Sequence, residues 1–525
     1  DQPRSRGLGD VYKRQILKYL PILLVFFGCD SFLDRESYDK MDSDGYYNST
    51  TALNSAVIAC YNGIQDALDK EFFLTEVRSD NSRNRNQAPT GSTDLEITHL
   101  DIYKVETSNA LNNTYWEAVY HNIANCNTVL QHLDGADDPE KRIQFEAEAR
   151  FIRAYHYFNL VRLYGPVFLV SERISPEVAK QAERTSREEI YTFIEEDLKF
   201  AAAELPEKYD DENLGRADQW AAKTLLAKVY LTLSNNGKVT KMLQQAKTLL
   251  EDVKENSGYG LLLDAGLMGS VYANVFSTAN EMNKEMIFVC RYAAGGKGLG
   301  APFANYFAPS ASEDAVIYGS GSSYNCPTED LIDAYKAEAG DQRKDVVLSE
   351  TWTSKLGVLQ HVGWVRKYYS QVTVRYDAEN DWPILRFADV LLMLGEIENE
   401  LNGPTDIANR YLNDIRERAG LEAITPANRV EYRAAMARER RLEFAMENQR
   451  FFDLVRTNQF IEVMENHLRT EQTRNQSSGS KSDYYGNEKY NTYVPNPKLE
   501  NWQLLLPIPY NVMISAPNAT QNVGY

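Results

Sequence analysis

The sequence has few of the residues from which metal and nucleophile sites are built. Among its 525 residues there are five cysteines and six histidines. Apart from Cys29, the cysteines (Cys60, Cys126, Cys290 and Cys326) are widely spaced without a CxxC pair, and no HExxH motif occurs. This pattern indicates no zinc site. One or two disulfides could form outside the cytoplasm, but the spacing does not fix their pairing.

Cofactor and calcium motifs are missing as well. The stretch GGKGLG at 295–300 lacks the GK[ST] ending of a phosphate-binding loop, and Ala301 breaks a GxGxxG pattern. A calcium loop starting at Lys40 would put a cation at the first ligand position and Thr51 where glutamate is needed, so a helix-capping turn is the simpler interpretation. We therefore predict a binding protein with no catalytic residues, no cofactor and no metal.

Basic charge is also scarce. The chain carries 56 Lys and Arg against 75 Asp and Glu, a net charge of -19. Nucleic-acid-binding proteins need a basic footprint, so no nucleic acid partner is expected. The 33 tyrosines, by contrast, are numerous. Tyrosine supplies rigid contact area with a polar tip, which suits the binding of flat polar ligands as well as helix packing.

The hydrophobic run near the N-terminus is too short to span a membrane. It covers twelve residues, Ile16 to Phe27, whereas a transmembrane helix needs about 20. Basic residues precede the run and the small residue Gly28 follows it, which is typical of a secretory signal peptide over residues 1–28. Residues 1–15 include no initiator Met, and we expect them to be a truncated or artefactual start.

Cys29 directly follows the predicted cleavage point. Bacterial lipoprotein signals are cleaved just before a cysteine, which then carries several acyl chains and anchors the protein stably. We predict that Cys29 is the lipid attachment site and that residues 29–49 form a tether. Phe27 is bulkier than the residue usual at its position, so an ordinary signal peptide is the alternative.

Helical periodicity dominates the rest of the chain. Apolar residues recur at helical spacing between residues 50 and 255, as Leu53 and Val57 do. Residues 257–380 are rich in Gly, Ser and Pro, with short β-type runs (EMIFVCRY, GWVRKYY). Helices resume at ILRFADVLLM within residues 381–525, which end in an extended tail. We predict an all-α fold of degenerate tetratricopeptide-like helix pairs with a loop-rich insertion and minor β structure.

The segment RERRLEFAMENQRFFDLVRTNQ, residues 438–459, predicts one continuous buried helix. Glu447 lies three residues before Arg450, within reach of a local ion pair. One apolar stripe along the helix would comprise Leu442, Ala445, Met446, Gln449 and Phe452.

Several segments, in their order along the chain, resemble the SusD/RagB family. They are CDSFLD, EARFIRAYHYFNLVRLYGPV, RFADVLLMLGEIENELNG, YLNDIRERAGL, ERRLEFAMENQRFFDLVR and the ending LLPIPYNVMISAPNATQNVGY. The resemblance runs from Cys29 to Tyr525. Met446 and Asn448 depart from it, because the family tends to have a smaller residue and Gly at these places.

The resemblance implies a surface-exposed outer-membrane lipoprotein of Bacteroidota-type bacteria, with residues 50–525 as a single SusD-like domain. Such proteins have an all-α, tetratricopeptide-like scaffold whose repeats face a SusC-type TonB-dependent transporter. They deliver glycans, or sometimes peptides, to this partner and catalyse nothing. Their ligand surface lies on loops and uses aromatic rings together with a few hydrogen-bonding side chains.

This combination of aromatic rings and hydrogen-bonding side chains selects the candidate ligand-binding residues. Sugar rings have apolar faces that stack on aromatic rings, and hydroxyls that need donors and acceptors. The polar candidates are Arg78, Asp80 and Asn81, and the aromatic candidates are Tyr292, Tyr306, Tyr324 and Trp352. Trp364 is assigned to packing because GWVRKYY has the pattern of a strand. For each candidate a packing role is the alternative, and for Arg78 and Asp80 it is a mutual ion pair or a helix cap.

Two further functions are compatible with the sequence. A lipid-anchored glycoside hydrolase would need two carboxyl groups about 5–9.5 Å apart in a cleft, and acidic residues are plentiful. A helical-repeat scaffold that binds only protein would have no use for the loop aromatics.

Overall fold

Pairs of helices, adjacent along the chain, build the scaffold of the protein. The computed structural model describes residues 46–84, 92–172, 174–310, 312–477 and 498–525, and residues 47–525 cluster as one unit. The predicted signal peptide, Cys29 and most of the predicted tether lie outside the described residues. The architecture below is that of residues 47–525.

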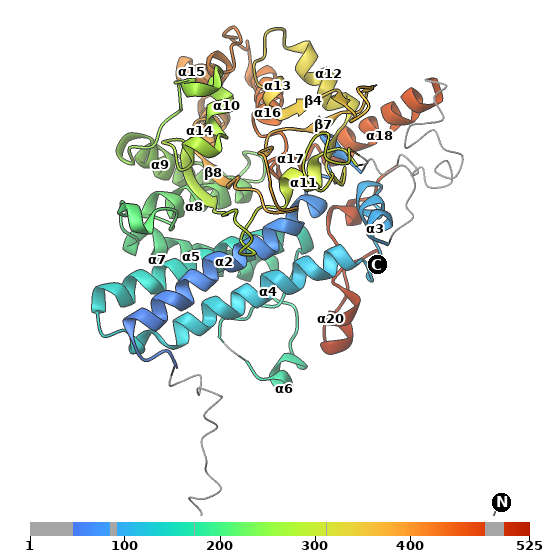
Figure 1. Ribbon diagram of the computed structural model, residues 1–525. Coiled ribbons are helices and arrows are strands. Elements are labelled where there is room, and N and C mark those ends of the chain that lie inside the picture. Colours follow the sequence, from blue (N-terminus) through green and yellow to red (C-terminus); the bar gives the residue numbers. More distant parts are fainter. Residues whose placement is uncertain (1–45, 85–91, 173, 311, 478–497) are drawn as a thin grey trace, which may run out of the picture. The chain divides into compact units, whose positions relative to one another are not determined.

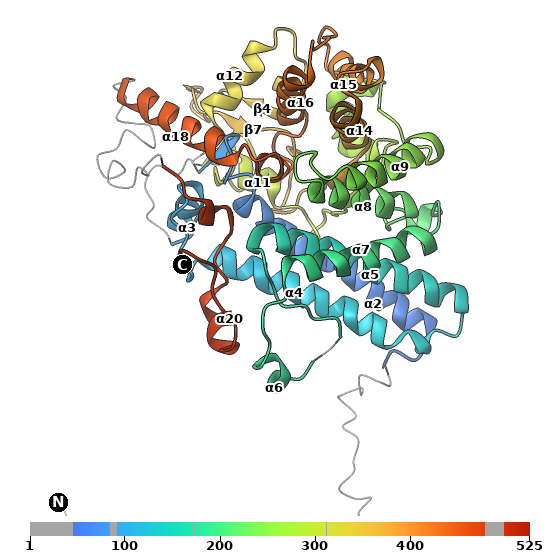
Figure 2. The same ribbon diagram turned by 180° about the vertical axis from the view of Figure 1, so that it is seen from behind.

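Four helix pairs follow one another in space (Figures 1 and 2). They are α2 (Thr50–Leu74) with α4 (Ala110–Gln131), α5 (Pro139–Tyr164) with α7 (Arg187–Glu204), α8 (Gln219–Leu233) with α9 (Thr240–Asn256), and α14 (Phe387–Asn402) with α15 (Asp406–Arg418). Each pair packs on the next through α4 and α5, α7 and α8, and α9 and α14. The predicted all-α, tetratricopeptide-like fold is confirmed.

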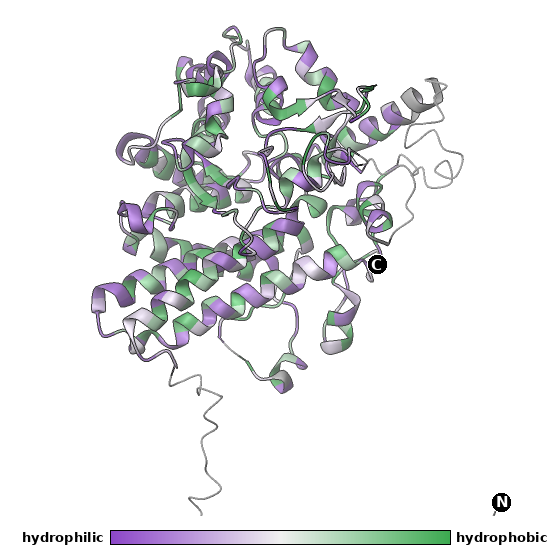
Figure 3. Ribbon diagram, viewed as in Figure 1, coloured by the Kyte–Doolittle hydropathy of each residue, from purple (hydrophilic) through white to green (hydrophobic). Residues whose placement is uncertain are grey.

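Local sequence signals explain where these helices begin and how closely they pack. Ser186 and Glu189 form a reciprocal capping box at the start of α7, which satisfies backbone N–H groups that have no partner within the helix. Gly63 lets α2 approach α4, because a Cβ there would lie 2.2 Å from Oδ1 of Asn122. Asn122 also donates to the carbonyl of Cys60 at 2.9 Å. Both apolar and polar residues occur along α2 and α4 (Figure 3), as in amphipathic helices.

Strands are short and lie mainly in the loop-rich insertion. In the described residues they form two-stranded antiparallel sheets: β1 (Ser82–Arg83) with β3 (Cys326–Pro327), β2 (Met286–Cys290) with β8 (Trp382–Arg386), β4 (Leu348–Ser349) with β7 (Trp364–Val365), and β5 (Trp352–Thr353) with β6 (Leu359–Gln360). The predicted strands in EMIFVCRY and GWVRKYY are confirmed. The residues before Phe387, expected to be helical, belong to β8 instead.

The insertion and the C-terminal region contain more helix than the sequence predicted. The other α-helices of the described residues are α3 (Ser92–Asp101), α6 (Pro176–Ala179), α10 (Val271–Val275), α11 (Phe303–Phe307), α12 (Glu329–Ala337), α13 (Lys344–Val347), α16 (Arg429–Glu443), α17 (Arg450–Arg456), α18 (Phe460–Ser477) and α20 (Tyr510–Ser515). The tail is therefore not simply extended. One hydrophobic core runs through the helix pairs and into the insertion.

The helix expected over residues 438–459 is broken, and that prediction was wrong. Helix α16 ends at Glu443 and α17 starts at Arg450. Between them Met446 and Asn448 adopt left-handed backbone conformations, with φ of 66° and 61°. Both backbone N–H groups donate to the carboxylate of Glu76, at 2.9 and 3.1 Å. A buried acid from α2 thus satisfies the amides that the break leaves without helical partners.

Candidate functional site

The three polar residues predicted to bind ligand lie inside the protein. Arg78, Asp80 and Asn81 are each at most 1% exposed. Arg78 donates to the carbonyl of Gln503 at 2.8 Å, and Asp80 accepts two hydrogen bonds from Arg450, at 2.7 and 2.8 Å. These contacts join the segment after α2 to the C-terminal region. The three side chains are closed to a ligand and are left out of the candidate site.

Two of the predicted tyrosines do lie together. The ring centroids of Tyr306, on α11, and Tyr324 are 5.5 Å apart, and both rings are half-buried. Tyr376, which the sequence did not single out, has its ring centroid 5.3 Å from that of Tyr306. Phe72 and Phe73 of α2 support Tyr306 from the core side, at 6.1 and 6.5 Å. We call Tyr306, Tyr324 and Tyr376 the tyrosine surface.

Asn305 holds the backbone around the tyrosine surface. Its fully buried amide donates to the carbonyls of Tyr318 and Ser320, both at 2.9 Å. Its oxygen accepts the backbone N–H of Tyr376 at 2.8 Å. Tyr376 has a left-handed φ of 64°, a conformation that costs a side-chain-bearing residue energy and persists only where its surroundings enforce it. Asn305 therefore positions Tyr376 beside Tyr306.

The glycine-rich stretch at 295–300 folds against the same region. Asp377 accepts the N–H groups of Gly295 and Gly296, both at 2.8 Å. Ala301 and Ala378 pair through two backbone hydrogen bonds, at 2.7 and 3.0 Å. The stretch is thus a loop held by a neighbouring carboxylate, which stabilises the chain on both sides of the tyrosine surface.

The hydroxyls of Tyr306 and Tyr324 have raised pKa values and therefore keep their protons at neutral pH. Burial is the largest cause that raises the pKa of Tyr306, and the charge of Asp69 adds to it. Burial and the charge of Asp94 likewise raise the pKa of Tyr324. The guanidinium of Arg375 lies 4.5 Å from the centroid of the Tyr376 ring. The region combines exposed ring area with protonated hydroxyls and one adjacent cation.

Tyr292 belongs to the core. It is 4% exposed, and its hydroxyl donates to Oδ1 of Asp69 at 3.0 Å. Burial raises the pKa of Asp69 to about 6. Tyr292 also lines a groove of about 1070 Å³ beside α2, whose other lining residues include Asn62 and Gln65. It does not join the tyrosine surface through a ring contact among the described residues.

The two tryptophans of the insertion have different surroundings. Trp364 is buried on β7 and donates to the carbonyl of Thr351 at 3.2 Å, so its predicted packing role is confirmed. Trp352, on β5, is half-buried and packs against the core. Within the described residues no ring contact links Trp352 to the tyrosine surface, so it stays a separate candidate.

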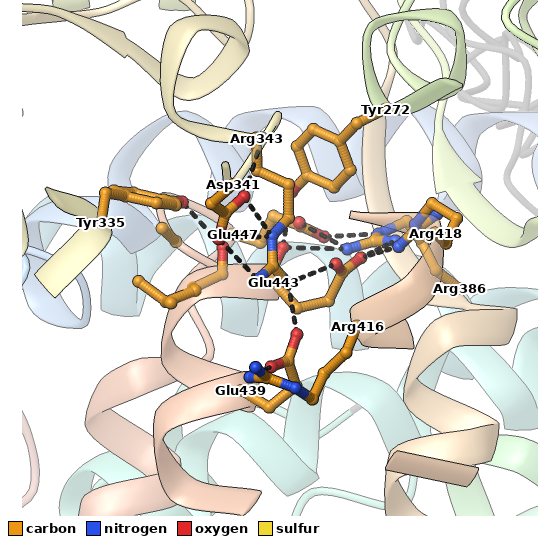
Figure 4. A network of polar contacts seen from close by, with 12 residues as sticks. Tyr272, Tyr335, Asp341, Arg343, Arg386, Arg416, Arg418, Glu439, Glu443 and Glu447 are labelled. Atoms are coloured by element: carbon orange, nitrogen blue, oxygen red, sulfur yellow. Dashed lines mark hydrogen bonds and ion pairs between the residues drawn. The ribbon is translucent and has the colours of Figure 1, made fainter. Parts of the chain in front are cut away.

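A buried network of charges joins the insertion to the C-terminal helices (Figure 4). Glu443 accepts from Arg386 at 3.0 Å and from Arg343 at 3.2 Å, and it also pairs with Arg418. Burial would raise the pKa of Glu443, but these arginines lower it to about 2. Glu447 pairs with Arg386 and Lys367, so the predicted local pair with Arg450 was wrong. Cations hold the carboxylates of this network, so removing one partner would leave a buried charge without its counter-charge.

The described part of the chain contains neither a disulfide nor a candidate metal site. The four cysteines there are buried and free of disulfides. No cluster of three or more His, Cys, Asp or Glu side chains in that part could hold a metal ion. None of the helices described is both long and apolar enough to cross a membrane.

The helix pairs and the inserted, loop-rich segment define a helical-repeat protein, and the aromatic surface on the insertion is its candidate site. Residues 347–525 match the model of the SusD family, and residues 31–231 match a SusD-like model described as starch-binding and associating with the outer membrane. The chain belongs to the SusD/RagB family, a glycan-binding family associated with the outer membrane.

Known proteins resemble the chain over nearly its full length. SusD-like protein P25 of Formosa agariphila is 25% identical over 98% of this chain and 99% of its own. A solved laminarin-binding SusD-like protein has a TM-score of 0.73 at 24% identity, covering 90% of this chain and 99% of its own. Surface glycan-binding protein A from Bacteroides thetaiotaomicron, solved with laminarihexaose, has a TM-score of 0.71 at 18% identity, covering 90% and 99%. The two solved structures share the fold of this chain.

Proposed function

We propose that this protein captures glycans at the outer-membrane surface and passes them, unaltered, to a SusC-type TonB-dependent transporter. The tyrosine surface is the observation that carries the proposal. All three rings are half-buried, and the ring centroid of Tyr306 lies 5.5 Å from that of Tyr324 and 5.3 Å from that of Tyr376. Rings fixed in this way offer apolar faces for sugar C–H groups, and their hydroxyls offer hydrogen bonds.

The family relationship supports the same assignment. Related proteins are named for binding laminarin and for a complex with laminarihexaose. The aromatic surface of this chain lies on the inserted segment, which leaves the outer faces of the helix pairs available to a protein partner. Lipidation of Cys29 would tether the protein to the outer membrane beside that partner. Replacing Cys29 by Ser should release the protein from the membrane fraction without changing glycan affinity.

Binding measurements with single-site variants test the glycan site. A glycan array with peptides included identifies ligands, and calorimetry then compares the wild type with Tyr306→Ala and Tyr324→Ala. Each variant should weaken glycan binding at least about tenfold, since an aromatic anchor in an interface commonly contributes over 1 kcal/mol. Tyr510→Ala is the matched control, because Tyr510 is 56% exposed on α20.

The same measurements separate the alternatives. If both tyrosine variants kept their glycan affinity and Gln65→Ala lost it, the binding site would be the groove beside α2. Array signals from peptides alone would make the ligand a peptide. Incubation of a bound oligosaccharide with the wild type should leave it intact by mass spectrometry, whereas cleavage products would identify a hydrolase.

A further inference from the structure

Arg375 is an exposed arginine whose side chain is held against the tyrosine surface. Its guanidinium carbon lies 4.5 Å from the centroid of the Tyr376 ring. Its aliphatic part covers Gly319, where a Cβ would come within 2.8 Å of Cγ of Arg375. Stacking on an aromatic face and packing against backbone restrict the side chain on two sides, so less freedom is lost when it binds a ligand.

The charge of Arg375 has no counter-ion within the described part of the chain. Its guanidinium forms no hydrogen bond or ion pair there. Two other cations of the insertion have acidic partners: Lys355 pairs with Asp314 at 3.1 Å, and Arg291 pairs with Asp381 at 2.8 Å. A positioned guanidinium without a partner has all its N–H donors available to a ligand.

The acids closest to Arg375 in the chain and at Gly319 already have partners: Asp377 accepts the N–H groups of Gly295 and Gly296, and Asp314 accepts the N–H of Gly319 at 2.8 Å and pairs with Lys355. Burial is the largest cause that raises the pKa of Tyr306 and of Tyr324, and the charge of Arg375 lowers both pKa values to a smaller extent. The nearest acid of α2, Asp69, already accepts the hydroxyl of Tyr292 at 3.0 Å. Donors and one positive charge thus gather beside the ring faces, an arrangement that complements an anion more closely than a neutral hydroxyl.

We propose that Arg375 recognises a negatively charged substituent, a carboxylate or a sulfate, on a glycan that stacks on the tyrosine surface. The inference rests on the proposed glycan-binding function and specifies its ligand class. The planar guanidinium matches the oxygen pair of either anion with two parallel hydrogen bonds, which lysine cannot reproduce. The net charge of -19 does not prevent the binding of an anion, because salt screens charges that lie more than about 8 Å away at physiological ionic strength.

Matched pairs of glycans test this selectivity. The probes are the acidic oligosaccharide that gives the strongest array signal and its neutral counterpart, made by carboxyl reduction for a uronate or by desulfation for a sulfate. The wild type should bind the acidic member at least about tenfold more tightly, as expected for a charge-assisted hydrogen-bond pair. Raising NaCl from about 50 to 300 mM should shrink the difference.

Substitutions assign the effect to Arg375. Arg375→Gln should remove most of the preference and change affinity for the neutral member less than about threefold. Arg375→Lys should retain only part of it. Arg410→Gln, at an exposed position of α15, is the control and should leave both affinities unchanged. Melting temperatures of the three variants confirm that they are folded.

The outcomes separate this inference from the function on which it rests. Equal affinity for both members of a pair, or equal losses for both in Arg375→Gln, would overturn the role of Arg375 while leaving glycan binding intact. Strong array signals from neutral glycans only would do the same. If no glycan of any class bound, the proposed function itself would be contradicted. Carboxyl-reduced and desulfated probes show which anion is recognised.

Discussion

Arg450 and Asp80 form a two-point ion pair although 370 residues separate them in the chain. Nε and Nη2 of Arg450 donate to the two carboxylate oxygens of Asp80 at 2.7 and 2.8 Å. Arg441 adds a third contact to Asp80, at 3.2 Å. The cluster ties the segment that follows the first helix to the segment that starts α17.

Removing one partner of this pair should destabilise the protein strongly. Asp80→Asn keeps the shape but leaves Arg450 buried without its counter-charge, and breaking such a pair costs about 3–5 kcal/mol. Urea unfolding followed by circular dichroism measures the loss. Glu462→Gln, at an exposed position of α18, is the control and should change stability by less than about 0.5 kcal/mol. A loss as small as the control's for Asp80→Asn would show that the pair contributes little.

Stability should fall as pH rises from 5 to 8. Burial raises the pKa of Glu71 and of Glu76 to about 7, so each binds a proton more tightly when folded than when unfolded. Their contribution is complete below the unfolded pKa of about 4.3 and is lost as pH passes 7, by about 3 kcal/mol for each group. Unfolding free energies measured at intervals across this range test the slope.

Glu76→Gln supplies the matching variant, because glutamine does not titrate. It should be less stable at pH 5, since it replaces one acceptor of the Met446 and Asn448 amides by a donor. Its stability should also vary less between pH 5 and 8 than that of the wild type. A slope as steep as the wild type's would assign the pH dependence to other groups.

Asn305 should act on ligand binding by positioning Tyr376. Asn305→Ala removes the acceptor of the Tyr376 N–H and both donors to the 318–320 loop. We expect glycan affinity to fall at least about fivefold, together with a stability loss of about 1–3 kcal/mol for buried groups left without partners. Asn305→Asp retains the acceptor and should recover part of the affinity. Full affinity in Asn305→Ala would show that the Tyr376 backbone needs no such support.

The backbone break after α16 predicts opposite effects at Asn448. Asn448→Gly should be neutral or stabilising by up to about 1 kcal/mol, because glycine adopts the observed φ of 61° without strain. Asn448→Val should lose more than about 1 kcal/mol, since a β-branched residue strongly disfavours that conformation. Thermal melts of the two variants test this prediction. A higher melting temperature for Asn448→Val than for Asn448→Gly would contradict it.

The outcome at residues 438–459 shows how far sequence patterns reach. Periodicity correctly made Leu442 a core residue, but it could not show that the helix stops at Glu443. Helical spacing suggested that Glu447 would pair with Arg450, whereas the structure pairs each with a residue far away in sequence. Spacing reports only neighbours along one helix, so it carries no information on partners from other segments.

For the candidate site as well, some residues could be selected from the sequence and others could not. Tyr306 and Tyr324 could be selected from the sequence because they lie in a long segment rich in Gly, Ser and Pro, where binding residues concentrate. Tyr376 and Arg375 lie in the same segment but were not selected. Polar and apolar residues alternate along QVTVRYDAEN, which is the pattern of a strand, whereas residues 371–377 form a loop in the structure. Arg78, Asp80 and Asn81 fit a polar loop by pattern, yet the C-terminal region covers them.

By itself, the sequence determined the helix pairs, the all-α class and the family, because these depend on local periodicity and on motifs in a fixed order. The tertiary structure decided which charges pair, where the C-terminal helix breaks and which tyrosines meet. Those outcomes depend on contacts between segments hundreds of residues apart, as between Asp80 and Arg450. Such contacts form only when the insertion and the C-terminal helices pack against α2.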